Sequence, residues 1–257
     1  MGQDYLFGHA MAAGFKNGLK QFYPSAQIVG EDFHKLFLTD YAPYLTKIQA
    51  SRAEVIYTGD WIPDAANLLK QARAMGIKLP FANTFIDEPN FLHEVGVEGT
   101  KGLIHVAQFG GPEPFFKNKG QIKYYRAWND QWKKWKKPYN GMLYKHGTGN
   151  IGAYRMHTYW LLDVIKRAGT LDQEKIIETW EGDQWSDVNG TVYYMRPCDH
   201  KANHDLYVEE YVEPAKQKGM FNIPPYYWYT GASEPGPTFV IPASMVPSKS
   251  APKLCKK

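Results

Sequence analysis

The chain has 257 residues, of which 44% are hydrophobic and 22% charged, an ordinary globular composition that can form one large domain or two smaller lobes. The net charge is only +4, and basic residues cluster only in WKKWKK at 132–137, so a nucleic-acid-binding surface is not indicated. No stretch approaches the ~20 apolar residues of a membrane-spanning helix, and residues 1–15 lack the pattern of a signal peptide.

Strands and helices alternate through the first part of the chain. The predicted elements are helix 7–22, strand 26–33, helix 40–51, strand 53–59, helix 63–76, strand 79–86, short helix 88–95 and strand 101–109. Apolar residues three or four apart indicate the first helix, and Pro63 and Gly76 mark the start and end of the third. Helices that join strands through short links favour right-handed crossovers and a doubly wound, parallel α/β sheet.

The pattern changes after the hinge-like sequence GGPEP at 110–114. The later predicted elements are helices 118–136, 150–168 and 172–180 and strands 191–196 and 206–212. From Pro224 to the end the chain is rich in proline, glycine and serine, which indicates an extended tail.

Aromatic and acidic residues gather where predicted strands give way to helices. They are Tyr5, Phe7, Asp60, Trp61, Phe85 and Asp87. Ligands of open parallel sheets bind at the carboxyl ends of the strands, and aromatic walls with a few polar groups are typical of a small-molecule cleft. Any one of these aromatics could merely fill the sheet edge, but as a group they favour a cleft.

Several longer segments carry a resemblance to a known family. They include QDYLFGHAMAAGFKNGLK, DYAPYLTKIQASRAEVIYTGDW, AANLLKQARAMG and DVIKRAGTLDQEKIIETWEG, within a stretch of about residues 3–212. This ordered series resembles the type I periplasmic solute-binding proteins of ABC importers, in the branched-chain amino acid (Leu/Ile/Val) receptor family. The resemblance implies two doubly wound lobes that close on a small solute in an inter-lobe cleft. It also implies a periplasmic or extracytoplasmic location, a membrane permease as partner, and no chemistry on the solute.

Compared with that family, the chain starts late. The resemblance implies that lobe two comprises 1–112 and 204–223, that 113–203 is the second half of lobe one, and that 224–257 is the extended tail. The first half of lobe one and its signal peptide are absent from this sequence. An incomplete lobe one would expose apolar surface, so we expect self-association unless that surface is covered.

The solute is harder to predict. Amino-acid receptors of the family place an acidic residue after the strand that corresponds to 79–86, where it meets the ammonium group of the ligand. Here that position is Phe85, with Asp87 two residues later. Either Asp60 or Asp87 supplies the charge from a shifted position, or the solute is an amide, an aromatic acid or another small carboxylate. The aromatic residues slightly favour the second reading.

Other readings were weighed against solute binding. His200 and His204 within CDHKANH have a metal-ligand spacing only if they lie on a helix, and that segment lies between two predicted strands. Cys198 and Cys255 could form a disulfide or remain separate thiols. No nucleophile elbow, phosphate loop or zinc-protease motif occurs, so we expect neither an enzyme nor a cofactor. A ligand-sensing domain of the same fold in a regulatory protein is the alternative function.

Overall fold

The computed structural model describes residues 1–61, 63–85, 95–96, 98–107, 119–135, 149–188, 190–211, 229–230 and 239–241. The chain divides into two compact units. Unit 1 holds the residues up to Val106, unit 2 holds Ala107 to Glu209, and the later residues are shared between the two units. The lobe boundaries expected from the resemblance stay a prediction.

Unit 1 is built on short parallel strands. Its elements are β1 (Gly2–Gln3), α1 (Leu6–Phe22), β2 (Phe33–His34), α2 (Ala42–Ala50), β3 (Ile56–Tyr57), α3 (Asp64–Ala74), β4 (Phe81–Asn83) and β5 (Leu103–Ala107). β1 pairs with β2, and β4 lies between β3 and β5, all in parallel. Ile56 lies opposite Phe81, and Phe81 opposite Leu103, so buried apolar side chains run across the sheet.

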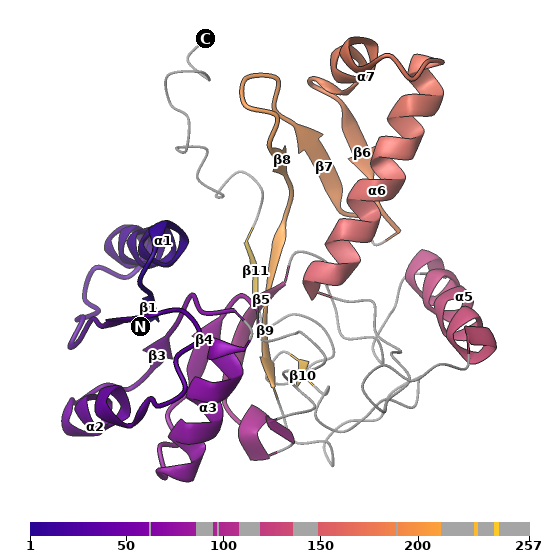
Figure 1. Cartoon of the computed structure of the whole chain (residues 1–257). Coiled ribbons are helices and arrows are strands. Elements are labelled where there is room, and N and C mark those ends of the chain that lie inside the picture. The colour runs from indigo at the N-terminus through magenta and orange to yellow at the C-terminus, as the bar shows by residue number, and fades with distance from the viewer. Residues whose placement is uncertain are drawn as a thin grey trace. The chain divides into compact units, whose positions relative to one another are not determined.

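Helices cover both faces of these strands. Figure 1 shows α1 on one side of β1 and β3, and α2 and α3 on the other. α2 and α3 bury Leu45, Leu68 and Leu69, each no more than 1% exposed. On the opposite side, Phe15 of α1 stacks on Tyr57 of β3 with the ring centroids 3.9 Å apart. This alternation of strand and covering helix is the doubly wound arrangement that the sequence predicts.

Two glycines let α1 approach the strands closely. A Cβ on Gly8 would lie 1.9 Å from the backbone oxygen of Gln3, and one on Gly59 would lie 2.7 Å from the Cβ of Met11. Real Cβ atoms do not tolerate such distances, so both positions require glycine unless the backbone moves. The first turn of α1 is therefore held directly against the end of β1, and this contact positions Tyr5 and Phe7.

Unit 2 packs one long helix on a small antiparallel sheet. Its elements are α5 (Lys119–Trp135), α6 (Gly149–Ala168), α7 (Gln173–Trp180), β6 (Gln184–Ser186), β7 (Val192–Met195), β8 (Ala202–Asn203), β9 (Leu206–Tyr211) and β11 (Phe239–Ile241). β7 lies between β6 and β8, and β9 pairs with β11, all antiparallel. Met156, Trp160 and Val164, spaced by four along α6, pack on Tyr193 and Met195 of β7. A further short strand, β10, spans Tyr229–Thr230.

The predicted helices agree with the observed ones to within two residues at each end, where the structure describes them. The predicted strand 26–33 is wrong except for its last residue, because Gly30 interrupts it and Ile28 and Val29 are each 51% exposed. β1, β6, β8, β10 and β11 were not predicted, since two or three residues carry too short a pattern, and the last two lie within the expected extended tail. The helix predicted at 88–95 and the hinge at 110–114 lie outside the described residues, apart from Val95.

Among the helices of the described ranges, none combines the length and the apolar character needed to cross a bilayer.

Candidate functional site

Four aromatic side chains of unit 1 meet at the carboxyl ends of β1, β3 and β4. The ring centroids of Tyr5 and Phe7 lie 6.0 Å apart, and those of Phe7 and Phe85 lie 5.9 Å apart. The indole Nε1 of Trp61 donates a hydrogen bond of 2.8 Å to the hydroxyl of Tyr5. The structure thus brings together the four aromatics that the sequence singles out, and we call them the aromatic cluster.

A fifth ring, which the sequence analysis did not single out, borders the cluster. Phe37 meets the indole of Trp61 edge to face, with centroids 5.9 Å apart and the planes at 90°. Its φ of 57° is unusual for a residue other than glycine. The backbone N–H of Phe37 donates to the buried carboxylate of Asp64 at 2.9 Å, and this bond holds the turn. Phe37 follows a two-residue strand, so no sequence pattern placed it here.

Asp60, unlike its neighbour Trp61, is not part of the aromatic cluster, because its carboxylate is bonded to His34. The Asp60 residue is 0% exposed, and its Oδ2 lies 2.9 Å from Nε2 of His34 on β2. Its backbone N–H donates to Thr58 Oγ1 at 3.0 Å, and its backbone oxygen accepts from the side-chain amide of Asn83 at 2.9 Å. Asp60 is therefore buried and held by His34, Thr58 and Asn83, while its second carboxylate oxygen, Oδ1, is buried without a hydrogen-bond partner.

The buried pair of His34 and Asp60 is an ion pair. The Nδ1 of His34 lies 2.9 Å from the backbone oxygen of Lys35, and its Nε2 faces the Asp60 carboxylate. Both partners only accept, so both ring nitrogens must donate and the ring is an imidazolium. Burial alone would lower the pKa of His34, but the hydrogen bond and charge of Asp60 outweigh it and the pKa is raised. The positive charge of the His34 imidazolium thus compensates the negative charge of Asp60.

Two further predicted site residues have different outcomes. Phe85 is partly buried and lies against Phe7 in the aromatic cluster. Asp87 lies outside the described residues, so its predicted role stays a prediction.

The comparison with known families agrees with this architecture. The model of a family described as periplasmic binding protein matches residues 1–218, which is most of the chain. The chain belongs to the periplasmic binding protein family. It has the α/β fold of type I periplasmic binding proteins, as the sequence resemblance implies. The proteins of this family and fold that it matches are solute-binding proteins rather than enzymes.

Individual relatives of this periplasmic binding protein are distant. Leu/Ile/Val-binding protein homolog 4 of Brucella melitensis is 24% identical over 214 residues, 80% of this chain and 47% of the relative. Among solved structures, a leucine-, isoleucine-, valine-, threonine- and alanine-binding protein from Brucella ovis in a closed conformation is similar, with a TM-score of 0.73 and 21% identity. That alignment covers 95% of this chain and 57% of the other.

A third similar protein holds an aromatic ligand. It is a solute-binding protein of an ABC transporter from Rhodopseudomonas palustris BisB5 in complex with 3,4-dihydroxybenzoic acid, with a TM-score of 0.64 and 16% identity. The alignment covers 82% of this chain and 55% of the other. The present chain therefore spans about half the length of the relatives that it matches.

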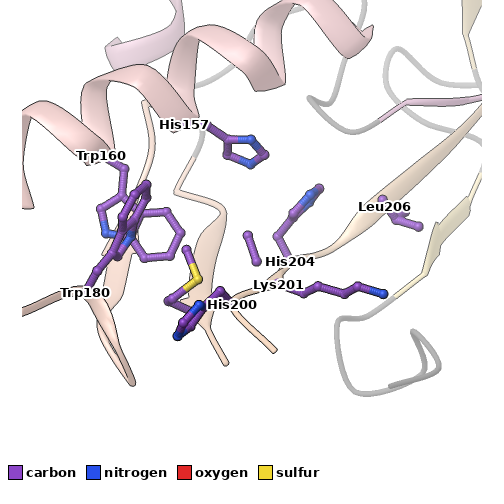
Figure 2. A pocket seen from close by; sticks show the side chains of 9 residues that line it. His157, Trp160, Trp180, His200, Lys201, His204 and Leu206 are labelled. Carbon is purple, nitrogen blue, oxygen red and sulfur yellow. The ribbon is translucent and has the colours of Figure 1, made fainter. Parts of the chain in front are cut away.

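Unit 2 of this periplasmic binding protein has a hollow of its own, of about 440 Å³, beside the core of α6 and β7. Figure 2 shows it with the indoles of Trp160 and Trp180 at one end and the imidazole of His157 reaching in from α6. Burial, with the nearby ring of His204, lowers the pKa of His157 to about 4. The hollow is open and mostly apolar, and the indole rings meet edge to face with centroids 5.3 Å apart.

Two of the histidines around this hollow, His200 and His204, have separate hydrogen-bond partners, whereas Nε2 of His157 is buried without one. His200 Nε2 lies 2.7 Å from a carboxylate oxygen of Glu181, and His204 Nδ1 donates to the backbone oxygen of Asp205 at 2.7 Å. Residues 197–199 form a turn, in which the N–H of His200 donates to the oxygen of Arg196 at 2.9 Å, and β8 follows at Ala202–Asn203, so His200 and His204 do not lie on a helix. Within the part of the chain that the structure describes, no three histidine, cysteine or acidic side chains are grouped to hold a metal ion.

Cys198 lies in this turn. Cys255 lies outside the described residues, so the pairing of the two stays a prediction.

Proposed function

We propose that this chain is part of an extracytoplasmic solute receptor of an ABC importer, and that the aromatic cluster of unit 1 contacts the solute. The observation that carries the proposal is the convergence of four aromatic side chains at the strand ends, where open α/β sheets bind ligands. A receptor of this kind works in the periplasm or another extracytoplasmic space and delivers its solute to a membrane permease.

The cluster favours an aromatic or other apolar carboxylate, or an amide, over an α-amino acid. The acidic side chain nearest to Trp61 in sequence, Asp60, is buried and paired with His34, so it offers no free counter-charge to an ammonium group. Leaving a buried ammonium unpaired would cost several kcal/mol. Aromatic rings, in contrast, stack favourably on one another in offset or edge-to-face geometry.

The first turn of α1 supports a negatively charged solute. α1 begins at Leu6, between Tyr5 and Phe7, and has no acidic residue in its first turn and no side chain capping it. The positive end of the helix dipole therefore lies at Tyr5 and Phe7, where it favours a carboxylate. Asp4, the nearest carboxylate, is exposed and paired with His9 at 2.9 Å.

Titration calorimetry on the 257-residue chain with 3,4-dihydroxybenzoate, benzamide and L-leucine tests the proposal. We expect the aromatic acid to bind more tightly than leucine, and Trp61→Ala to weaken its binding roughly tenfold to hundredfold, because a stacking face is lost. The matched control is Tyr23→Ala, which removes a 64% exposed ring at the far end of α1. Equal loss in both variants, or preference for leucine, would contradict the proposal.

A further inference from the structure

Asn83 joins the two loops that carry Trp61 and Phe85. It is the last residue of β4 and is 3% exposed. Its Nδ2 donates to the backbone oxygen of Asp60 at 2.9 Å, and its Oδ1 accepts from the backbone N–H of Phe85. One side chain thus bonds the residue directly before Trp61 and the backbone of Phe85 itself.

The chemistry of this position calls for an amide. One partner is a carbonyl oxygen that only accepts and the other is an N–H that only donates, so the side chain must offer both a donor and an acceptor. Aspartate offers no donor at neutral pH, and an apolar residue offers neither. The bond to the Asp60 oxygen is buried and the bond from the Phe85 N–H is partly buried, so leaving either backbone group unpaired is unfavourable.

Asp60, the first anchor point of Asn83, is itself fixed. Its carboxylate is paired with the imidazolium of His34, and its N–H is bonded to the hydroxyl of Thr58. These partners are 1% and 2% exposed, respectively. Through Asn83, the backbone N–H of Phe85 is therefore linked to a buried residue that has hydrogen bonds of its own. The indole of Trp61 is held at its other end by the Tyr5 hydroxyl.

We propose that Asn83, supported by the buried His34–Asp60 pair, is a positioning residue that fixes Trp61 and Phe85 as walls of one solute site. The inference deepens the proposed function and rests on it for the role of the walls, although the tether itself can be tested without any solute. Asn83 acts on the solute through the two rings and does not itself contact it.

Fluorine NMR on the full chain labelled with 5-fluorotryptophan, with the Trp61 signal assigned by Trp61→Phe, tests the tether directly. We expect Asn83→Ala to shift or broaden the Trp61 signal in the absence of solute, and to weaken binding of 3,4-dihydroxybenzoate about tenfold. Thr58→Val, which keeps the side-chain shape but removes one bond to Asp60, is a milder second variant and should move the same signal. Thr58→Val replaces Asn83→Ala in this test if Asn83→Ala does not fold.

Phe81→Leu is the matched control, because Phe81 is equally buried in β4 but bonds neither loop through its side chain. It should lower stability and leave the Trp61 signal in place. An unchanged Trp61 signal in Asn83→Ala and Thr58→Val, or an equal change in Phe81→Leu, would overturn the inference. If the signal moves as expected but the parent chain binds no 3,4-dihydroxybenzoate, the tether stands and the proposed solute class fails.

Discussion

Single residues at the strand ends of unit 1 divide into those that face the candidate site and those that support it. Trp61 joins the aromatic cluster, whereas its neighbour Asp60 points into the protein and pairs with His34. The sequence analysis placed both residues in one cleft, but consecutive residues leaving a strand turn to opposite sides, and here their side chains have different roles. The most consequential polar residues here, His34 and Asn83, act through bonds to backbone and to a neighbouring charge.

His157 in unit 2 makes stability depend on pH. Its pKa of about 4 lies below the ordinary value of 6.5, so between these pH values the unfolded chain binds a proton that the folded chain does not. Stability therefore falls as the pH falls through this window. We expect a loss of about 1–2 kcal/mol between pH 7 and pH 5, after allowance for partial exposure.

Urea unfolding of the parent chain and of His157→Gln at pH 8, 7, 6 and 5 measures this effect. The variant should lose less stability on acidification, and its remaining loss comes from other groups such as His204 and His105, whose pKa burial also lowers. The values at pH 8 serve as the internal reference, because at that pH His157 is unprotonated in both the folded and the unfolded chain. Parallel pH profiles for the two proteins would rule out His157 as the source.

The sequence predicted the four rings of the aromatic cluster but not their supports. Strand ends of a parallel sheet meet at one edge, and this rule alone is enough to gather Tyr5, Phe7, Trp61 and Phe85. The partner of Asp60 lies 26 residues away on a two-residue strand. No local periodicity encodes such a pairing, and so the sequence analysis kept Asp60 as a solute ligand.

Among the elements, helix α1 depends most on close approach. Its first turn lies against β1 at Gly8, while the middle of the helix at Gly14 has open space around it. Residues 7–22 were predicted as a helix from apolar spacing, yet nothing in that spacing reveals which glycine is required. The same limit explains strand 26–33, where Ile28 and Val29 suggested a strand that the tertiary structure leaves exposed.

Gly8→Ala and Gly14→Ala form a matched pair within this helix. We expect Gly8→Ala to destabilise unit 1 by roughly 1–3 kcal/mol, because the added Cβ would meet the Gln3 backbone oxygen and push α1 away from β1. Gly14→Ala should stabilise the protein by roughly 0.5–1 kcal/mol, because alanine favours a helix and meets no neighbour. Chemical unfolding gives both values. Destabilisation of similar size in both variants would contradict the role assigned to Gly8.

At the scale of the whole molecule, exposed apolar residues on α6 offer a surface through which two copies of the chain could associate. The helix buries Met156, Trp160 and Val164 on one face. On the other side, Tyr154 is 61% exposed, Leu162 56% and Tyr159 48%. A helix with apolar residues on both faces is normally buried on both. Tyr154, Tyr159 and Leu162 therefore form a candidate surface of unit 2 for the expected self-association.

Sedimentation velocity at several concentrations tests this surface. We expect species heavier than one chain, with the heavier fraction rising with concentration, and we expect Leu162→Lys to reduce that fraction by placing a charge in the contact. Leu171→Lys is the control, since Leu171 is 81% exposed but lies in the link after α6. A single species of monomer mass at every concentration would be evidence against association.

The amide at position 83 has a consequence for how selectivity could change. If Asn83 positions both rings as proposed, a backbone shift at Trp61 would also disturb Phe85, because the same side chain bonds the residue before Trp61 and the N–H of Phe85. A change in solute preference would then come from replacing the side chains of Trp61 and Phe85 while the backbone that Asn83 holds stays the same. If the proposed solute site is correct, substitutions at positions 61 and 85 with Asn83 kept are therefore expected to change solute preference with the least disturbance of the two loops.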